Sequence, residues 1–108
     1  MQINGKEITV ASERWSVPYP VADARVVDQS VIVLYDYMTG PRHRQFQNLE
    51  AFDFTGRKLW TAEHPTSATQ DCYVAFQSIR PLRLSNFAGF ECELAPDSGR
   101  IIAATFTK

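Results

Sequence analysis

The fold is decided by a stretch that reads Asn48-Leu-Glu-Ala-Phe-Asp-Phe-Thr-Gly-Arg-Lys-Leu-Trp60. Thr55-Gly56 divides it into two runs of β-forming residues, which predicts a strand, a tight turn and a second strand. A second stretch has the same order and reads Gly89-Phe-Glu-Cys-Glu-Leu-Ala-Pro-Asp-Ser-Gly-Arg-Ile-Ile102. The chain therefore repeats a strand–turn–strand unit, and its apolar residues do not keep the 3.6-residue period of a helix.

Further strands are expected before each copy. Residues 31–37 form a nearly continuous apolar run, which is typical of a central strand covered on both faces. The eight strands expected are 24–27, 31–37, 47–54 and 57–63, then 72–79, 82–87, 90–94 and 100–107. They make two four-stranded antiparallel meanders, at 23–63 and 72–107. Because each sheet must bury one face, the two are expected to pack face to face.

The N-terminal segment predicts a small additional element. Asn4-Gly5 is a strong signal for a two-residue turn, since a type I′ turn needs positive φ at both positions. It predicts a short β-hairpin from residues 1–3 and 7–10, and residues 11–15 are expected to form one helical turn at most. The full expectation is an all-β single domain over 1–108, with 1–22 as hairpin and connection.

Composition excludes several classes of protein. The formal net charge is −1 and the pI is about 6.1, whereas nucleic-acid binders usually carry a basic face. No apolar stretch approaches membrane-spanning length, and the N-terminus has no signal-peptide pattern. We therefore expect a cytoplasmic protein without nucleic-acid or membrane partners, in which Cys72 and Cys92 are reduced thiols.

The first stretch resembles a blade of the quinoprotein-like or WD40-like β-propellers. Five of its residues match the blade motif, with one residue missing between the second and third: Ala51, Asp53, Thr55, Gly56 and Trp60. The resemblance implies that Trp60 docks onto the neighbouring sheet. The second copy keeps the turn glycine 43 residues later, a blade-like spacing, but has Ala103 at the tryptophan position. A closed propeller needs at least four blades, so no axial cofactor site is implied and no cofactor is expected.

The whole chain also resembles a group of short bacterial all-β proteins of unknown function. The similarity rests on Asn4–Ile8, Pro18–Pro20 and Asn48–Trp60. It implies a small stand-alone domain and no particular activity.

The long loop 38–46 and its borders hold the first candidate binding residues. Tyr37, Arg42, His43 and Arg44 suit an anion or an acidic partner, because arginine gives bidentate hydrogen bonds. The alternative is an ordinary solvated loop. Trp15 and Tyr19 lie beside prolines and outside the repeats, so they are the second candidates, as exposed aromatic contacts; their alternative is core packing.

Catalytic and metal-binding residues are not expected. His43 and His64 lack a carboxylate or cysteine at ligand spacing. Cys72 and Cys92 are predicted on strands that are not neighbours, which disfavours a disulfide. No phosphate-binding glycine loop or nucleophile motif is present.

Two functions remain open from the sequence. The favoured one is a non-enzymatic protein-interaction domain, of antitoxin or immunity type or one that pairs with a second copy of itself. The alternative is a small-molecule-binding protein or minor enzyme. It predicts a pocket near loop 38–46, lined by Tyr35, Tyr37, Arg42 and His43.

Overall fold

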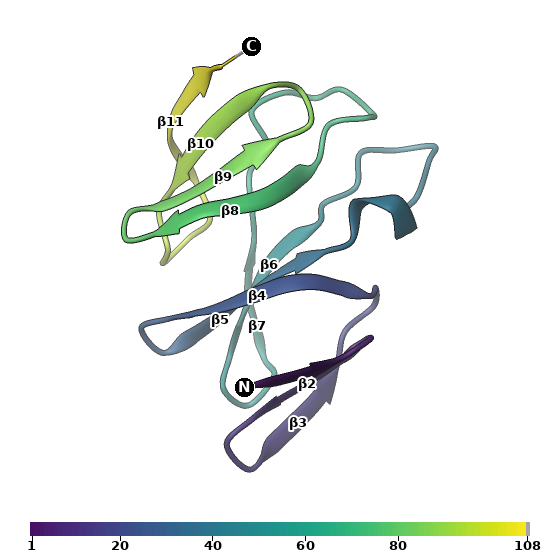
Figure 1. Ribbon diagram of the computed structural model, residues 1–108, viewed down its shortest axis with the longest axis vertical. Coiled ribbons are helices and arrows are strands. Elements are labelled where there is room, and N and C mark those ends of the chain that lie inside the picture. Colours follow the sequence, from purple (N-terminus) through teal and green to yellow (C-terminus); the bar gives the residue numbers. More distant parts are fainter. Residues whose placement is uncertain (108) are drawn as a thin grey trace.

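The computed structural model describes residues 1–107 and is all-β, with eleven strands and one short 3-10 helix, η1 (Tyr37–Thr39) (Figure 1). The first sheet consists of β1 (Gln2–Asn4), β2 (Glu7–Val10) and β3 (Glu13–Ser16). The middle sheet consists of β4 (Val21–Val27), β5 (Ser30–Tyr35), β6 (Leu49–Asp53) and β7 (Lys58–Thr61). The last sheet consists of β8 (Tyr73–Ile79), β9 (Leu82–Asn86), β10 (Phe90–Leu94) and β11 (Ile101–Phe106).

The two four-stranded antiparallel sheets predicted from the sequence are confirmed. Each is a meander in chain order, β4-β5-β6-β7 and β8-β9-β10-β11. Alternate side chains of the two sheets meet in one apolar core, in which Leu34 and Ala51 of the middle sheet share a cluster with Leu84 and Cys92 of the last. This burial of facing apolar surfaces holds the two sheets together.

The N-terminal element differs from the expected hairpin. Residues 13–16 form a third strand, β3, where at most a helical turn was expected at 11–15. Ala11 adopts a positive φ of 54°, which closes a tight turn between β2 and β3. A non-glycine residue in this conformation is uncommon, so the sequence carried no clear turn signal there.

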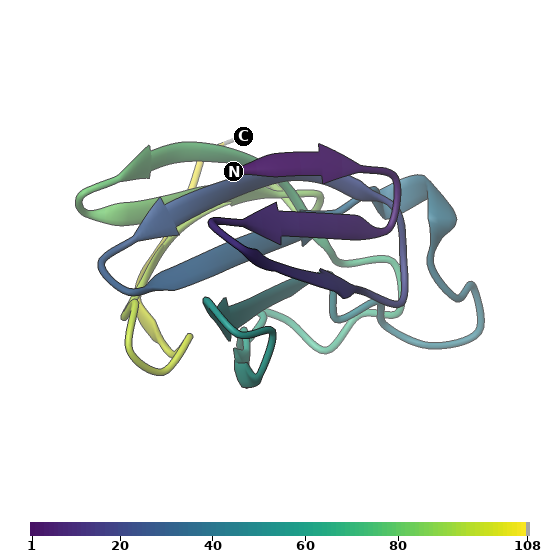
Figure 2. The ribbon, with the colours of Figure 1, turned by 90° about the horizontal axis from the view of Figure 1, so that it is seen from below.

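The first sheet covers the second face of the middle sheet, so the molecule is a stack of three sheets (Figures 1 and 2). Ile8 of the first sheet packs with Val31, Val33 and Phe52 of the middle one. All six residues of β5 are buried, because this strand lies between two layers.

The first and middle sheets each place a tryptophan over a turn glycine of the next sheet. Trp60 of β7 packs over Gly99, and its Nε1 donates a hydrogen bond of 3.0 Å to the Pro96 carbonyl. Trp15 of β3 packs over Gly56 in the same way. The docking of Trp60 on the neighbouring sheet, implied by the sequence, is therefore present.

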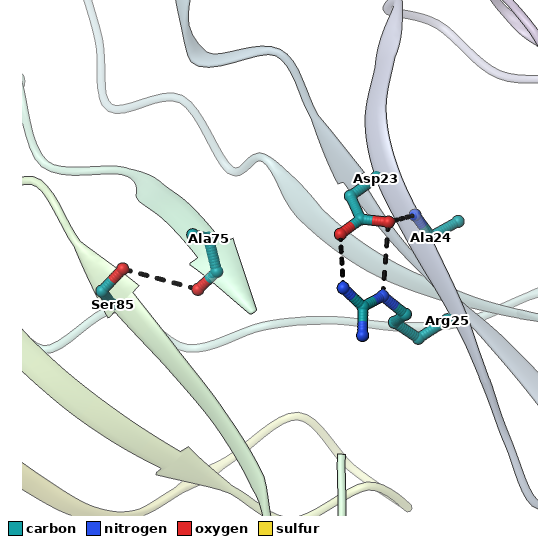
Figure 3. A network of polar contacts seen from close by, with 5 residues as sticks. All are labelled: Asp23, Ala24, Arg25, Ala75 and Ser85. Atoms are coloured by element: carbon teal, nitrogen blue, oxygen red, sulfur yellow. Dashed lines mark hydrogen bonds and ion pairs between the residues drawn. The ribbon is translucent and has the colours of Figure 1, made fainter. Parts of the chain in front are cut away.

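The middle and last sheets also touch along two of their edge strands, β4 and β8. Arg25 of β4 lies 5.2 Å from the ring centre of Phe76, and its guanidinium is held by a 2.9 Å ion pair with Asp23 (Figure 3). On the last sheet, the Ser85 hydroxyl donates to the Ala75 carbonyl across β8 and β9 (Figure 3).

Both ends of the stack are polar. The register of the first sheet, with Ile8 and Trp15 facing inward, leaves an outer face of Gln2, Asn4, Glu7, Thr9, Arg14 and Ser16. The outer face of the last sheet carries a shallow hollow lined by Arg83, Glu91, Glu93, Ala103 and Thr105. Neither outer face is built to bury a further sheet.

Candidate functional site

The segment after β5 makes one wall of a pocket. The Asp36 side chain accepts a 3.0 Å hydrogen bond from the backbone N–H of Met38, which starts the turn of η1. This turn leaves Tyr37 and Met38 exposed at 45% and 65% of their surfaces. Further on, the ring of Phe46 lies against Gly40 so closely that any side chain at position 40 would overlap it. The loop is thereby folded back over its own buried phenylalanine.

The opposite wall is organised by Asp71, which is 1% exposed. One carboxylate oxygen accepts from the Thr66 hydroxyl at 2.7 Å and the other from the Asn86 amide at 2.7 Å. Asn86 in turn accepts from the backbone N–H of Phe90. These bonds join the segment before β8 to the turn between β9 and β10, which carries the exposed Phe87.

The two walls are also joined directly. Gln45 donates from its side-chain amide to the carbonyls of Thr66 and Ala68, at 2.9 and 3.0 Å. The pocket between them has a volume of about 440 Å³, within the usual range of ligand pockets. Its lining consists of Tyr37, Met38, Pro41, Arg42, Phe46, Thr69, Gln70, Asp71, Cys72 and Phe87.

The thiol in the pocket lining, that of Cys72, is not activated by its surroundings. Burial raises the pKa of the Cys72 thiol, and the Asp71 carboxylate adds to the same effect. The thiol therefore stays protonated at neutral pH and is a poor nucleophile. Within residues 1–107 no group of three or more His, Cys, Asp or Glu side chains could hold a metal ion.

The sequence candidates in the long loop fall into two groups. Tyr37 and Arg42 line the pocket. His43 and Arg44 belong to the same loop and are exposed, but they are not part of the lining. Tyr35, expected in the lining, is 1% exposed and instead donates its hydroxyl to Glu50 at 2.9 Å in the core between the first two sheets.

Trp15 and Tyr19, the second pair of sequence candidates, lie away from the exposed surface of the long loop. Both are partly buried between the first and middle sheets. The Tyr19 ring packs against Phe46 at 4.6 Å and Tyr35 at 5.6 Å between ring centres. Tyr19 therefore supports the pocket wall from behind, through Phe46, and Trp15 lies over the turn at Gly56.

The comparisons with known proteins identify the family. The chain belongs to the family described as Domain of unknown function (DUF7957), whose model matches residues 1–106. No curated protein and no solved structure matches the chain. Since the match includes residues 1–16, the three-stranded first sheet is part of the DUF7957 domain. Within residues 1–107, no helix is long and apolar enough to cross a membrane.

Several pocket residues of this DUF7957 chain were not predicted as site residues. Met38 and Phe46 are the two end residues of loop 38–46, and they were not chosen because the site expected there was one for an anion or an acidic partner. Asp71 and Cys72 lie just before β8 of the last sheet, and no local pattern indicates that they face loop 38–46. Phe87 precedes the tight turn Ala88-Gly89, and no local pattern indicates that it is exposed beside loop 38–46.

Proposed function

We propose that this chain is a non-enzymatic protein-interaction domain of the bacterial cytoplasm, of the antitoxin or immunity type or one that also pairs with a second copy of itself. Its binding site is the pocket between loop 38–46 and Phe87. The partner inserts an apolar side chain there and places a carboxylate near Arg42.

One observation carries the proposal: three large apolar side chains lie exposed around a single pocket. Tyr37, Met38 and Phe87 are 45%, 65% and 53% exposed. Aromatic residues and methionine are enriched where proteins bind each other, since they give much contact area with adaptable packing. The blade-like repeats then serve as a rigid scaffold that holds the two walls, which fits the resemblance to propeller blades.

The test is position-specific cross-linking in the native host. A photo-reactive phenylalanine analogue replaces Phe87, and in a control chain it replaces Arg14 on the polar end of the first sheet. We expect a discrete adduct from position 87 that is absent from position 14. The adduct should disappear when Met38→Asp is combined with the probe at position 87. Equal adducts from both positions, or none from position 87, would contradict the proposal.

The second candidate is a small-molecule-binding protein, which the 440 Å³ volume of the same pocket favours. Native mass spectrometry of the chain purified from its host separates the two. A bound mass of a few hundred daltons that is lost in Phe87→Ala would support the small-molecule-binding function over the protein-interaction function.

A further inference from the structure

The last strand, β11, is an edge strand, and within residues 1–107 no other strand pairs with its outer side (Figure 1). Ile102 and Phe106 are 60% and 58% exposed, although both are large and apolar. Between Arg100 and Lys108 the chain carries no charge at all. An exposed, uncharged, apolar edge of this kind is prone to pair with another strand.

The backbone of β11 presents free hydrogen-bonding groups at defined residues. Thr107 donates its N–H to the carbonyl of Gly89, and Thr105 is paired with Glu91 in the same register. In an antiparallel pair the bonded residues alternate, so the N–H and C=O groups of Ala104 and Phe106 point away from β10. These four groups have the spacing that a further antiparallel strand requires.

The other edges of the three sheets are protected. β3 and β7 are four residues long and carry charges, at Glu13 and Arg14 in one and at Lys58 in the other. β8 has two register shifts and lies beside β4. β1 has only three residues. Short length, charge and irregular register are the ordinary ways in which proteins block edge pairing. β11 is neither short nor charged.

We propose that β11 pairs antiparallel with β11 of a second copy, with Thr105 on the two-fold axis. In this register Ala104 lies opposite Phe106 of the second copy, and Phe106 lies opposite Ala104 of the second copy. The outward N–H and C=O groups of these residues then form four hydrogen bonds between the two copies. Phe106, which already packs edge-to-face on Phe90 at 5.3 Å, covers the small Ala104 of the other copy. The two Thr105 side chains meet on the polar face of the joined eight-stranded sheet.

The choice of a second copy as occupant rests on the pattern of the strand itself. Two-fold pairing brings every residue of a strand against its own sequence, so a charged strand would oppose like charges. β11 avoids this, because residues 101–107 are uncharged. A large residue, Phe106, lies two positions from a small one, Ala104, and the proposed register joins them. The polar outer faces of the stack offer no competing apolar interface.

The inference rests on the interaction role proposed above but uses a different surface. Ala104→Pro leaves the pocket intact, so the cross-linking adduct of position 87 should survive in this variant. A wild-type chain that gives the adduct but stays monomeric would overturn the pairing of β11 alone, and one that dimerises but gives no adduct would overturn the role of the pocket alone.

The test combines a proline substitution with a cysteine pair. The wild-type chain is expected to sediment with a mass rising from 12.2 kDa towards twice that value as its concentration increases. Ala104→Pro removes an N–H that faces away from β10, so the variant should fold, as judged by circular dichroism, and stay monomeric. Thr105→Cys should cross-link the dimer under mild oxidation, because opposite Cα atoms in this register lie within disulfide range.

The matched control is Ala103→Cys, which lies on the same face of β11. Its symmetry mate would stand opposite Thr107, so a dimer band much weaker than that of Thr105→Cys is expected. A mass that stays at 12.2 kDa up to the solubility limit would overturn the inference. So would equal cross-linking at positions 103 and 105, even if Ala104→Pro proved unable to fold.

Discussion

Gly99 has no substitute, for two separable reasons. Its φ of 73° is one that residues with a side chain adopt only with strain. A Cβ at this position would also overlap the ring of the buried Trp60. The positive φ follows from the turn, whereas the ring above it comes from a different sheet.

Gly99→Ala is therefore expected to lower the free energy of unfolding by about 2–4 kcal/mol, from strained φ together with overpacking. Gly5→Ala is the matched control, because Gly5 has a φ of 63° but no atom within 4 Å of the added Cβ. Its cost should be about 1–2 kcal/mol, from the backbone alone. Urea denaturation of both variants measures the difference. An equal loss of unfolding free energy in Gly99→Ala and Gly5→Ala would mean that the Trp60 ring shifts without cost to make room for the added Cβ.

His64 is a residue whose burial has a pH consequence. Neither of its ring nitrogens has a hydrogen-bond partner among residues 1–107, and the centre of the ring lies 4.8 Å from that of Tyr73. Burial lowers the pKa of His64, and the nearby Asp71 carboxylate opposes this only in part. As pH falls, the unfolded chain takes up the proton first. The stability that neutral His64 contributes is thus present above its ordinary pKa and is lost as pH falls below it.

His64→Gln should flatten this loss. Between about pH 7.5 and about pH 5.5 we expect the wild-type free energy of unfolding to fall more than that of the variant, by at most about 1.4 kcal/mol per pH unit. His43→Gln, a change in the exposed loop, should keep the wild-type slope. Urea denaturation at the two pH values is the measurement, and parallel slopes for the wild type and His64→Gln would refute the expectation.

At the scale of the element, β5, β6 and β8 are held together by one buried side chain. Asn48 is fully buried just before β6. Its amide donates to the carbonyls of Tyr35 and Tyr73, at 3.2 and 2.7 Å, and its carbonyl oxygen accepts from the N–H of Tyr73. Asn48 therefore connects the middle and last sheets close to the pocket.

Asn48→Ala should cost about 3 kcal/mol of unfolding free energy, because three hydrogen bonds are lost and the backbone groups of Tyr73 stay buried. Gln47→Ala, its exposed neighbour, should change stability by less than about 0.5 kcal/mol. Thermal and urea unfolding give both values. A cost for Asn48→Ala no larger than that for Gln47→Ala would show that the connection between sheets does not depend on this side chain.

At the scale of the whole molecule, the middle sheet depends on layers from both sides. The first sheet covers a cluster that includes Val31, Val33, Tyr35 and Phe52, all less than a tenth exposed. A chain lacking residues 1–16 would leave this surface in water. The transfer cost of several such side chains, each about 1.5–3 kcal/mol, is comparable to the whole stability of a small domain.

Removal of residues 1–16 should thus give a chain that binds a hydrophobic dye and has lost its near-ultraviolet circular dichroism. The full-length Thr9→Gln variant, altered only on the polar end face, should behave as the wild type. Dye fluorescence and circular dichroism are the measurements. A truncated chain with an unchanged unfolding temperature would show that the first sheet is an appendage.

The sequence predicted most of the fold from local patterns. Alternation and turn residues place all eight strands expected in the two four-stranded sheets to within a few residues. Thr55-Gly56 marks its turn because Asp53 accepts the N–H groups of Thr55 and Arg57. β3 was missed because its turn uses Ala11, a residue without a turn signal. Half of the pocket was also accessible, since Tyr37 and Arg42 lie in the one long loop of the first repeat.

By itself, the sequence determined the class of fold, the two four-stranded sheets and the place of the long loop, because these depend on residues close together in the chain. The tertiary structure alone decided which side chains meet across sheets. It brought Asp71 and Phe87 to the loop, packed Trp15 and Tyr19 partly buried between the first and middle sheets, and left β11 uncovered. Such contacts join residues tens of positions apart, and they follow from how whole layers stack rather than from any local pattern.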